Sequence, residues 1–157
     1  MADYPGAVAA IKARFEANWA STPYCYVNGQ ACATVDDPTS ESPNPINWAL
    51  FEIAHVPSYI AATGTPGQQT IVYPGMIKVH IMSPHGLGDD AGLALAVAAG
   101  EIFRNKLFYD DVTPGCFVRT GYDLNGQPRV DGGDIVSDDG EWFSHTATIP
   151  FEYWHRG

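Results

Sequence analysis

The sequence predicts one α+β domain, in which a mostly antiparallel sheet packs against two helices. Its 157 residues are enough for a single hydrophobic core, so we expect one domain over residues 1–157. Segments that alternate apolar and polar residues occur in groups, whereas helical periodicity appears in only two places. Strict alternation of strand and helix is missing, which argues against a doubly wound parallel sheet.

Two segments have the pattern of helices. In residues 6–20 the apolar side chains recur at helical spacing, and Pro5 suits the first turn. A second helix is expected from Asp89 or Asp90, which can cap it, to about residue 106. Its middle, residues 93–99, is apolar on nearly all sides. Such a helix is buried on more than one face, for example between the sheet and a neighbouring subunit.

The strands are expected at residues 24–28, 47–56, 70–73, 76–82, 116–122, 129–137 and 142–154. A break is expected at Pro74-Gly75, and Pro150 is expected at an edge or a bulge. In residues 76–82, three apolar side chains alternate with Lys78 and His80, which predicts one buried and one polar face. The residues expected to share one core are Phe15, Ile53, Val79, Ile81, Val97, Phe103 and Ile149.

The charge of the chain argues against nucleic-acid recognition. The formal net charge is −10, and the eight Lys and Arg residues are scattered. Binding to DNA or RNA needs a basic surface that neutralises phosphates, so sequence-specific binding is not expected. An acidic surface suits a conduit that repels passing DNA, although solubility alone also explains it. The charged fraction of 17% is low, which indicates that partners cover part of the surface.

The cysteines and the hydropathy pattern exclude two further classes. Three cysteines without regular spacing do not build a disulfide framework. Cys25 and Cys32 can pair around a small loop, but free thiols are the favoured interpretation. The first residues lack the pattern of a secretory signal, so none is expected, and no apolar run of about 18 residues occurs, so no membrane association is expected.

A search for catalytic and metal-binding patterns gives weak signals. His80 and His85 with Asp89 and Asp90 are metal-ligand types, but a polar strand face and a helix start explain them equally well. No G-x-S-x-G motif occurs, and the glycines before the second helix lack the spacing of a phosphate loop. A thiol such as Cys25 or Cys116 beside a histidine remains the formal alternative. We therefore expect no catalytic residue, no metal and no cofactor.

Two groups of residues are candidates for contacts with partners. The stretch 123–141 is acidic and poor in apolar residues, so it is expected to be an exposed hairpin. It is interpreted as an arm that contacts a partner or the channel, with a merely solvated hairpin as the alternative. Its acidic side chains are Asp123, Asp131, Asp134, Asp138, Asp139 and Glu141. The candidate subunit contacts are Lys78, His80, Trp142 and Trp154.

The order of these segments resembles the tail terminator-like proteins of long-tailed bacteriophages. An opening helix at residues 7–19 precedes an irregular polar loop and an extended strand at 48–56. A central strand at 77–84 then leads through a glycine-containing turn into an alanine-rich helix at 89–108. The last strand contains Pro150-Phe151-Glu152-Tyr153, which resembles the family's Pro-Phe-x-Tyr ending.

The resemblance implies a subunit of a six-membered ring without an active site. Such a ring binds the end of the tail tube protein, stops its elongation and offers a joining surface to the head-completion proteins of the neck. DNA passes through its central hole without sequence-specific binding. The protein is then a virion component assembled in the cytoplasm of a bacterial host. The alternatives are another head–tail connector or tail-completion protein and, less favoured, a small hydrolase that uses Cys and His.

Overall fold

The structure, a computed structural model, confirms the α+β class, with two helices and one eight-stranded, mostly antiparallel sheet. It describes residues 3–27, 29, 46–65, 67–86, 88–110, 115–121, 128–135 and 142–156. The helices are α1 (Tyr4–Asn18) and α2 (Asp90–Phe103). The strands are β1 (Tyr24–Tyr26), β2 (Trp48–His55), β3 (Tyr59–Ala62), β4 (Thr70–Pro84), β5 (Lys106–Phe108), β6 (Phe117–Thr120), β7 (Arg129–Ile135) and β8 (Trp142–Arg156).

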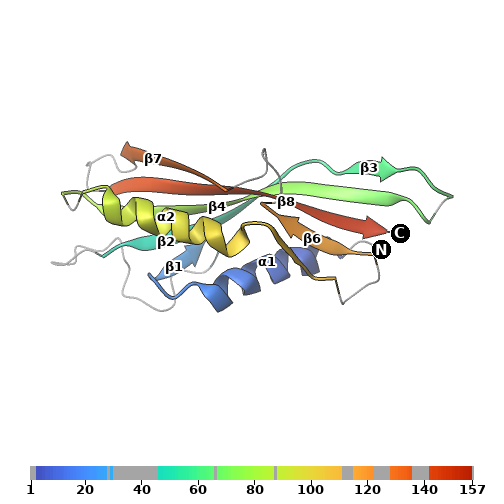
Figure 1. Cartoon of the computed structure of the whole chain (residues 1–157), viewed down its shortest axis with the longest axis horizontal. Coiled ribbons are helices and arrows are strands. Elements are labelled where there is room, and N and C mark those ends of the chain that lie inside the picture. Colours follow the sequence, from blue (N-terminus) through green and yellow to red (C-terminus); the bar gives the residue numbers. More distant parts are fainter. Residues whose placement is uncertain are drawn as a thin grey trace.

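Two long strands form the axis of the molecule. β4 and β8 have 15 residues each and pair antiparallel over their whole length, from Thr70 opposite Arg156 to Pro84 opposite Trp142. β2 and β3 pair successively with the free side of β4, and β7 and β6 pair with the free side of β8. β1 lies parallel to β2, and β5 lies outside β6. The fold is therefore elongated, with β3 at one end (Figure 1).

Two prolines lie inside these long strands, which corrects two expectations. Pro74 does not break β4, and Pro150 lies within the central strand β8 rather than at an edge. On one side of β4, the neighbour changes from β3 to β2 beside Pro74. On one side of β8, the neighbour changes from β7 to β6 beside Pro150. A proline lacks the N–H that a strand residue donates to its neighbour. The missing hydrogen bond is tolerated at these two positions, because one neighbouring strand ends there and the next begins.

Both helices cover the same face of the sheet. The Asp3 side chain accepts a hydrogen bond from the Gly6 N–H at the start of α1, and a proline stands in its first turn as expected. α1 buries Ala7, Ile11 and Phe15, and the Phe15 ring lies 4.7 Å from that of Phe51. α2 presents small residues and Phe103 to the sheet. Gly92 lets the helix approach β4 and β8 closely, because a Cβ there would lie 2.6 Å from Ser83 Oγ and 2.8 Å from His145 Nδ1.

The second helix is shorter than expected. It ends at Phe103 rather than at about residue 106, and the segment Lys106–Phe108, which the resemblance assigned to this helix, forms β5. Asn105 adopts a positive φ of 49°, and its N–H donates to the Gly121 carbonyl at 2.8 Å. This left-handed residue follows the end of the helix and turns the chain into β5, which pairs with β6.

The core contains most of the residues expected there. Phe15, Val79, Ile81, Phe103 and Ile149 are buried, and Ile53 packs against them partly exposed. Val97 is 45% exposed, so its place in the core was predicted wrongly. The sequence of α2 is apolar on both sides, and periodicity alone does not say which side meets the sheet.

The two described cysteines differ in state. Cys116 is a buried thiol, whereas Cys25 is disulfide-bonded, which corrects the expectation of free thiols.

Candidate assembly surfaces

One face of the central sheet is not covered by either helix, and we call it the open face. Successive residues of a strand point to opposite faces, and the odd-numbered residues of β4 and β8 are those that meet the helices. The even-numbered residues therefore form the open face. Lys78 and His80 of β4 and Trp142 and Trp154 of β8 all lie on it, because the β4–β8 register is continuous. The structure thus places all four candidate contact residues on one surface.

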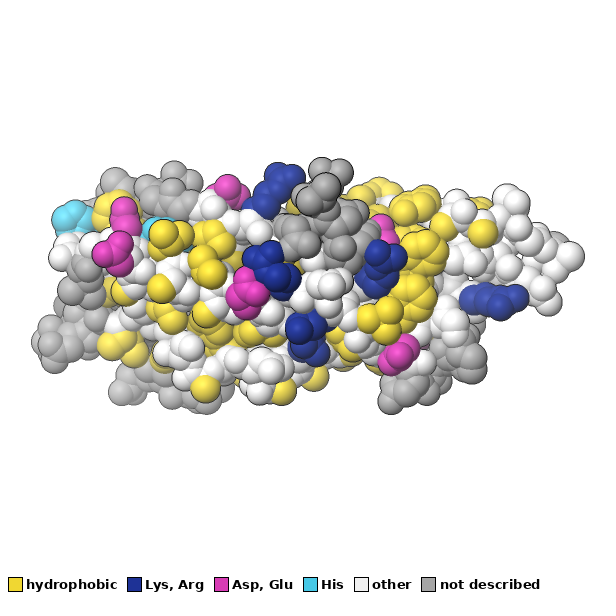
Figure 2. Space-filling model, viewed as in Figure 1, with side chains coloured by type: hydrophobic (Ala, Val, Ile, Leu, Met, Phe, Trp, Pro, Cys, Tyr) yellow, Lys and Arg dark blue, Asp and Glu magenta, His cyan; other side chains and the backbone are white. Residues whose placement is uncertain are grey.

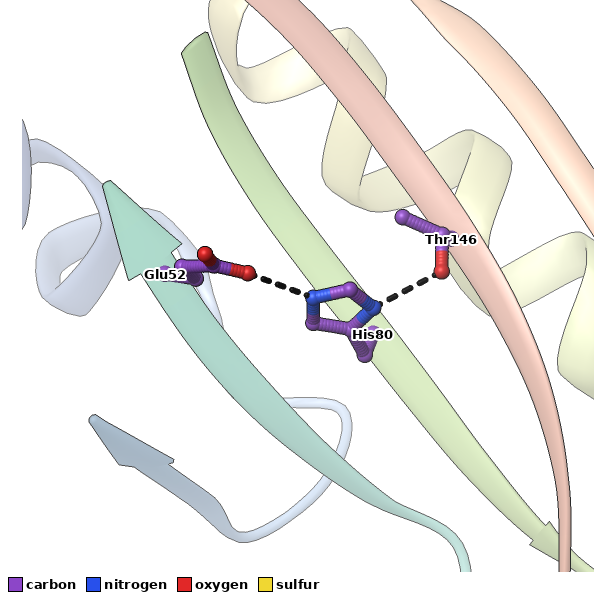
Figure 3. Close-up of polar contacts among 3 residues, drawn as sticks. All are labelled: Glu52, His80 and Thr146. Atoms are coloured by element: carbon purple, nitrogen blue, oxygen red, sulfur yellow. Dashed lines mark hydrogen bonds and ion pairs between the residues drawn. The ribbon is translucent and has the colours of Figure 1, made fainter. Parts of the chain in front are cut away.

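A polar network occupies the middle of the open face. The His80 Nε2 atom lies 3.1 Å from Glu52 Oε2, and its Nδ1 atom lies 2.8 Å from Thr146 Oγ1 (Figure 3). Three strands, β2, β4 and β8, supply one side chain each. The imidazole is held from both sides, so its ring orientation on the surface is fixed. The side chains of His80 and Glu52 are 21% and 32% exposed, so a partner can still reach them.

The two tryptophans lie at opposite ends of the open face. Trp154 stacks on Phe117 with ring centroids 5.7 Å apart, and its Nε1 donates to Glu152 at 2.9 Å. Trp142 lies edge-on to Trp48 at 6.2 Å. Trp154 is 12 residues beyond Trp142 along β8, which is about 40 Å at the usual rise per residue. They therefore cannot bind one small ligand together, although one large partner can contact both.

Sequence reasoning missed Glu52, Thr146, Trp48 and Phe117 as members of this surface. The alternation of β2 places Glu52 on the face opposite Phe51 and Ile53, but its meeting with His80 depends on the register between β2 and β4. In that register Glu52 lies opposite Lys78 and diagonal to His80. The alternation of each strand predicts a face but not a register, so no signal in the sequence identifies the pair.

The acidic arm is only partly described. Residues 129–135 form β7 and pair with β8, so the middle of the arm belongs to the sheet. Asp131 lies opposite Thr146 and is exposed, and Asp134 lies opposite Ser144 in the same ladder. The other four acidic positions, Asp123, Asp138, Asp139 and Glu141, lie outside the described residues.

The residues considered for metal binding are not brought together. His80 lies in the middle of the open face, while the ring of His85 stacks on Phe143 at 5.5 Å beyond the end of β4. Asp89 occupies the position before α2 as expected, without a capping hydrogen bond from its side chain. Within the described ranges, no group of three or more His, Cys, Asp or Glu side chains has metal-binding geometry.

One cysteine does lie beside a histidine. The Sγ atom of Cys116 is 3.4 Å from His155 Nδ1, and both residues are buried. Burial lowers the pKa of His155, and burial is also the main cause that raises the pKa of Tyr153 to about 12. A neutral imidazole in a dry site does not promote a thiolate. Two hollows of about 300 and 230 Å³ open elsewhere on the surface, and neither is lined by this pair.

The comparisons with known proteins bear on the fold alone. No family model matches the chain, and no curated protein matches it. A solved structure aligns with 96% of this chain and 97% of its own, with a TM-score of 0.54 and 13% sequence identity. The TM-score indicates a shared fold, and a sequence identity this low gives no information about function. Among the described residues, no helix is long and apolar enough to cross a membrane.

Proposed function

We propose that the protein is a virion assembly component that acts like a phage tail terminator. In this proposal it forms a ring, of six copies as the resemblance implies, that caps the tail tube, stops its elongation and offers the joining surface to the neck. The open face carries the proposal, because a sheet covered by helices on one face only has a large surface available for protein contacts. The order of the segments, which resembles that family, supplies the specific role.

The composition of the open face fits a protein partner better than a small ligand. It combines aromatic side chains at both ends with the Glu52–His80–Thr146 network between them. Aromatic anchors supply contact area, and oriented polar groups select the partner. The low charge density of the chain agrees with a surface that partners cover.

The acidic arm has a separate place in this proposal. Asp131 is exposed on β7, at the side of the sheet away from β2. Acidic groups there would repel DNA that passes through a ring, or steer docking of a basic neck protein. Sequence-specific DNA binding, a membrane anchor and a cofactor have no part in the proposed function. The protein would act in the virion after assembly in the host cytoplasm.

The test is assembly of the purified chain, alone and with tail tube protein. We expect native mass spectrometry to give a closed oligomer, at least with tube present, and electron microscopy to place it at tube ends. Lys78→Glu should reduce tube binding while the fold is retained. Lys106→Glu in β5 is the matched charge change outside the central strands of the open face and should leave binding unchanged. A chain that stays monomeric and leaves tube ends unoccupied contradicts the proposal.

A second candidate, a thiol hydrolase, has one observation in its favour, the contact between Cys116 and His155. Burial of both groups makes it the weaker candidate, because a nucleophile has to reach its substrate. Reaction of the native protein with a thiol reagent distinguishes a catalytic role of Cys116 from a packing role. Rapid modification of Cys116 would favour the hydrolase, and modification only after unfolding would favour a packing role.

A further inference from the structure

One end of the molecule contains an uncharged segment, which we call the tongue. We define the tongue as residues 56–62, which include β3, together with the segment Thr70–Val72 that pairs with β3. No charged side chain or histidine occurs between Val56 and Ile77, in a chain whose formal net charge is −10. Val56, Tyr59 and Ile60 are 44%, 49% and 55% exposed. Three large apolar side chains are therefore exposed in a segment that has no charged side chain of its own, which is typical of a surface that binds another protein.

The outer strand of the tongue differs from the outer strand on the other side of the sheet. β7 carries Arg129 and Asp131, and charged side chains on an edge strand discourage pairing with other chains. β3 has an irregular register near Ile60 but carries no charge. An exposed edge without this protection is a docking element or a risk of aggregation.

The second feature is an apolar stripe on α2. Leu93 and Val97, one helical turn apart, are 44% and 45% exposed, and Ala94 and Ala98 beside them are also exposed. These four residues, which we call the α2 stripe, point away from the sheet, because the opposite side of α2 is buried. Figure 2 shows apolar side chains gathered over this helix, with acidic side chains at its borders. Asp89 and Asp90 stand at its start and are exposed.

The tongue and the α2 stripe lie toward opposite ends of the molecule. The tongue contains the first residues of β4, whereas α2 packs where β4 ends, since a Cβ on Gly92 would come within 2.6 Å of Ser83 Oγ. Ser83 is 12 residues beyond Ile71, which corresponds to about 40 Å of strand. Figure 1 shows β3 at one end and the start of α2 near the other. One copy therefore cannot fold its tongue onto its own stripe.

We propose that the tongue of one copy packs on the α2 stripe of the next copy. This contact is heterologous, because it joins two different surfaces, and repeated contacts of this kind close into a ring or extend as a filament. This inference rests on the proposed function, because the contact between tongue and stripe would be the contact between neighbouring subunits of the proposed ring.

Charge favours a second copy as the occupant. Arg156 lies opposite Thr70, at the end of the tongue farthest from the body of the sheet, while Asp89 and Asp90 border the α2 stripe. Acidic copies repel one another over most of their surfaces, and the two apolar regions are where this repulsion is weakest. Contact between tongue and stripe would also bring the guanidinium of one copy toward the carboxylates of the next.

The experiment uses the full chain and two surface variants. Ile60→Glu disables the tongue, Val97→Glu disables the stripe, and Leu107→Glu changes a residue in β5 that is 56% exposed and belongs to neither. Sedimentation velocity over a concentration series up to the solubility limit measures self-association. We expect the wild type and Leu107→Glu to associate, and each of the other two variants to lose association.

A mixture of the two variants gives the sharper result. Ile60→Glu keeps its stripe and Val97→Glu keeps its tongue, so an equimolar mixture should form a one-to-one dimer that grows no further. A contact between two tongues or two stripes would not be restored by mixing. Circular dichroism identifies a misfolded variant, and Val56→Glu then replaces Ile60→Glu.

Several outcomes overturn the inference without deciding the proposed function. These are unchanged association of Ile60→Glu and Val97→Glu, a mixture that stays monomeric, and a wild type that shows no self-association. Binding of the wild type to tube ends is measured separately, and a failure to bind counts against the proposed function. Self-association that Ile60→Glu and Val97→Glu abolish would still support the tongue–stripe contact in that case.

Discussion

The two faces of the central sheet differ although the same strands build them. On β4, Val79 is fully buried under the helices, while the side chain of the next residue, His80, is 21% exposed on the open face. On β8, buried Ile149 alternates with partly exposed Thr148. One face therefore supplies the apolar burial that stabilises the fold, and the other is available for contacts. Changes on the two faces should consequently affect different properties.

The largest expected effect comes from a charge on the covered face. Val79→Asp places a carboxylate in the core without a partner, which costs several kcal/mol and is comparable to the whole stability of an ordinary domain. We expect the variant to be unfolded by circular dichroism. Lys78→Asp, the neighbouring position on the open face, should remain folded. A soluble and fully folded Val79→Asp protein would show that the assignment of the two faces is wrong.

The alternation within a strand is the part of this comparison that the sequence predicts. Ile77, Val79 and Ile81 were expected on one face and Lys78 and His80 on the other, and the burial of β4 follows that pattern. Period two is a local property of the backbone, so it needs no knowledge of neighbouring strands. The same reasoning predicted both helices and most strands, with differences of a few residues at their ends.

Features that depend on neighbouring elements were not predictable. β3 was missed because four residues without clear alternation resemble a loop, and it forms by pairing with β4. Pro74 was expected to interrupt its strand, since the changeover between β3 and β2 beside it is not visible locally. Val97 was placed in the core because α2 is apolar on both sides. The Glu52–His80 contact likewise needs the register between two strands.

The second prediction tests how closely α2 packs on the covered face. A Cβ on Gly92 would lie 2.6 Å from Ser83 Oγ and 2.8 Å from His145 Nδ1. Alanine favours a helix over glycine by about 1 kcal/mol, but overpacking of a core typically costs about 1–3 kcal/mol. We expect Gly92→Ala to lower the free energy of unfolding in urea. A more stable Gly92→Ala protein would mean that α2 can move away from the sheet at little cost.

The third prediction concerns a buried titratable group on the covered face. Burial lowers the pKa of His155 below its ordinary value of 6.5, so the unfolded chain binds this proton more readily than the folded one. The contribution to stability is fully present above about pH 6.5 and is lost as the pH falls through the folded pKa. His155→Gln should show a smaller loss of stability than the wild type on acidification. His85→Gln, at an exposed position, is the control and should follow the wild type.

The smallest effect is expected on the open face, at the contact between Glu52 and His80. Both side chains are partly exposed, and their atoms lie 3.1 Å apart. Cross-strand pairs and exposed ion pairs contribute about 0.2–1 kcal/mol. A double-mutant cycle with Glu52→Gln and His80→Gln should therefore give a coupling free energy in this range, measured by urea unfolding. Both side chains are partly exposed, so the coupling should shrink with added salt.

The ion pair between Glu101 and Arg104 on α2 is the internal reference for that measurement. Its atoms are closer, at 2.7 Å, but its side chains are 50% and 43% exposed. Water screens the α2 pair more strongly, so its coupling should be no larger than that of the network on the open face. The network has the further hydrogen bond between His80 and Thr146, which orients the imidazole. A coupling of several kcal/mol would place Glu52 and His80 among the groups that hold the fold together, and the division between a stabilising face and an available face would then not hold.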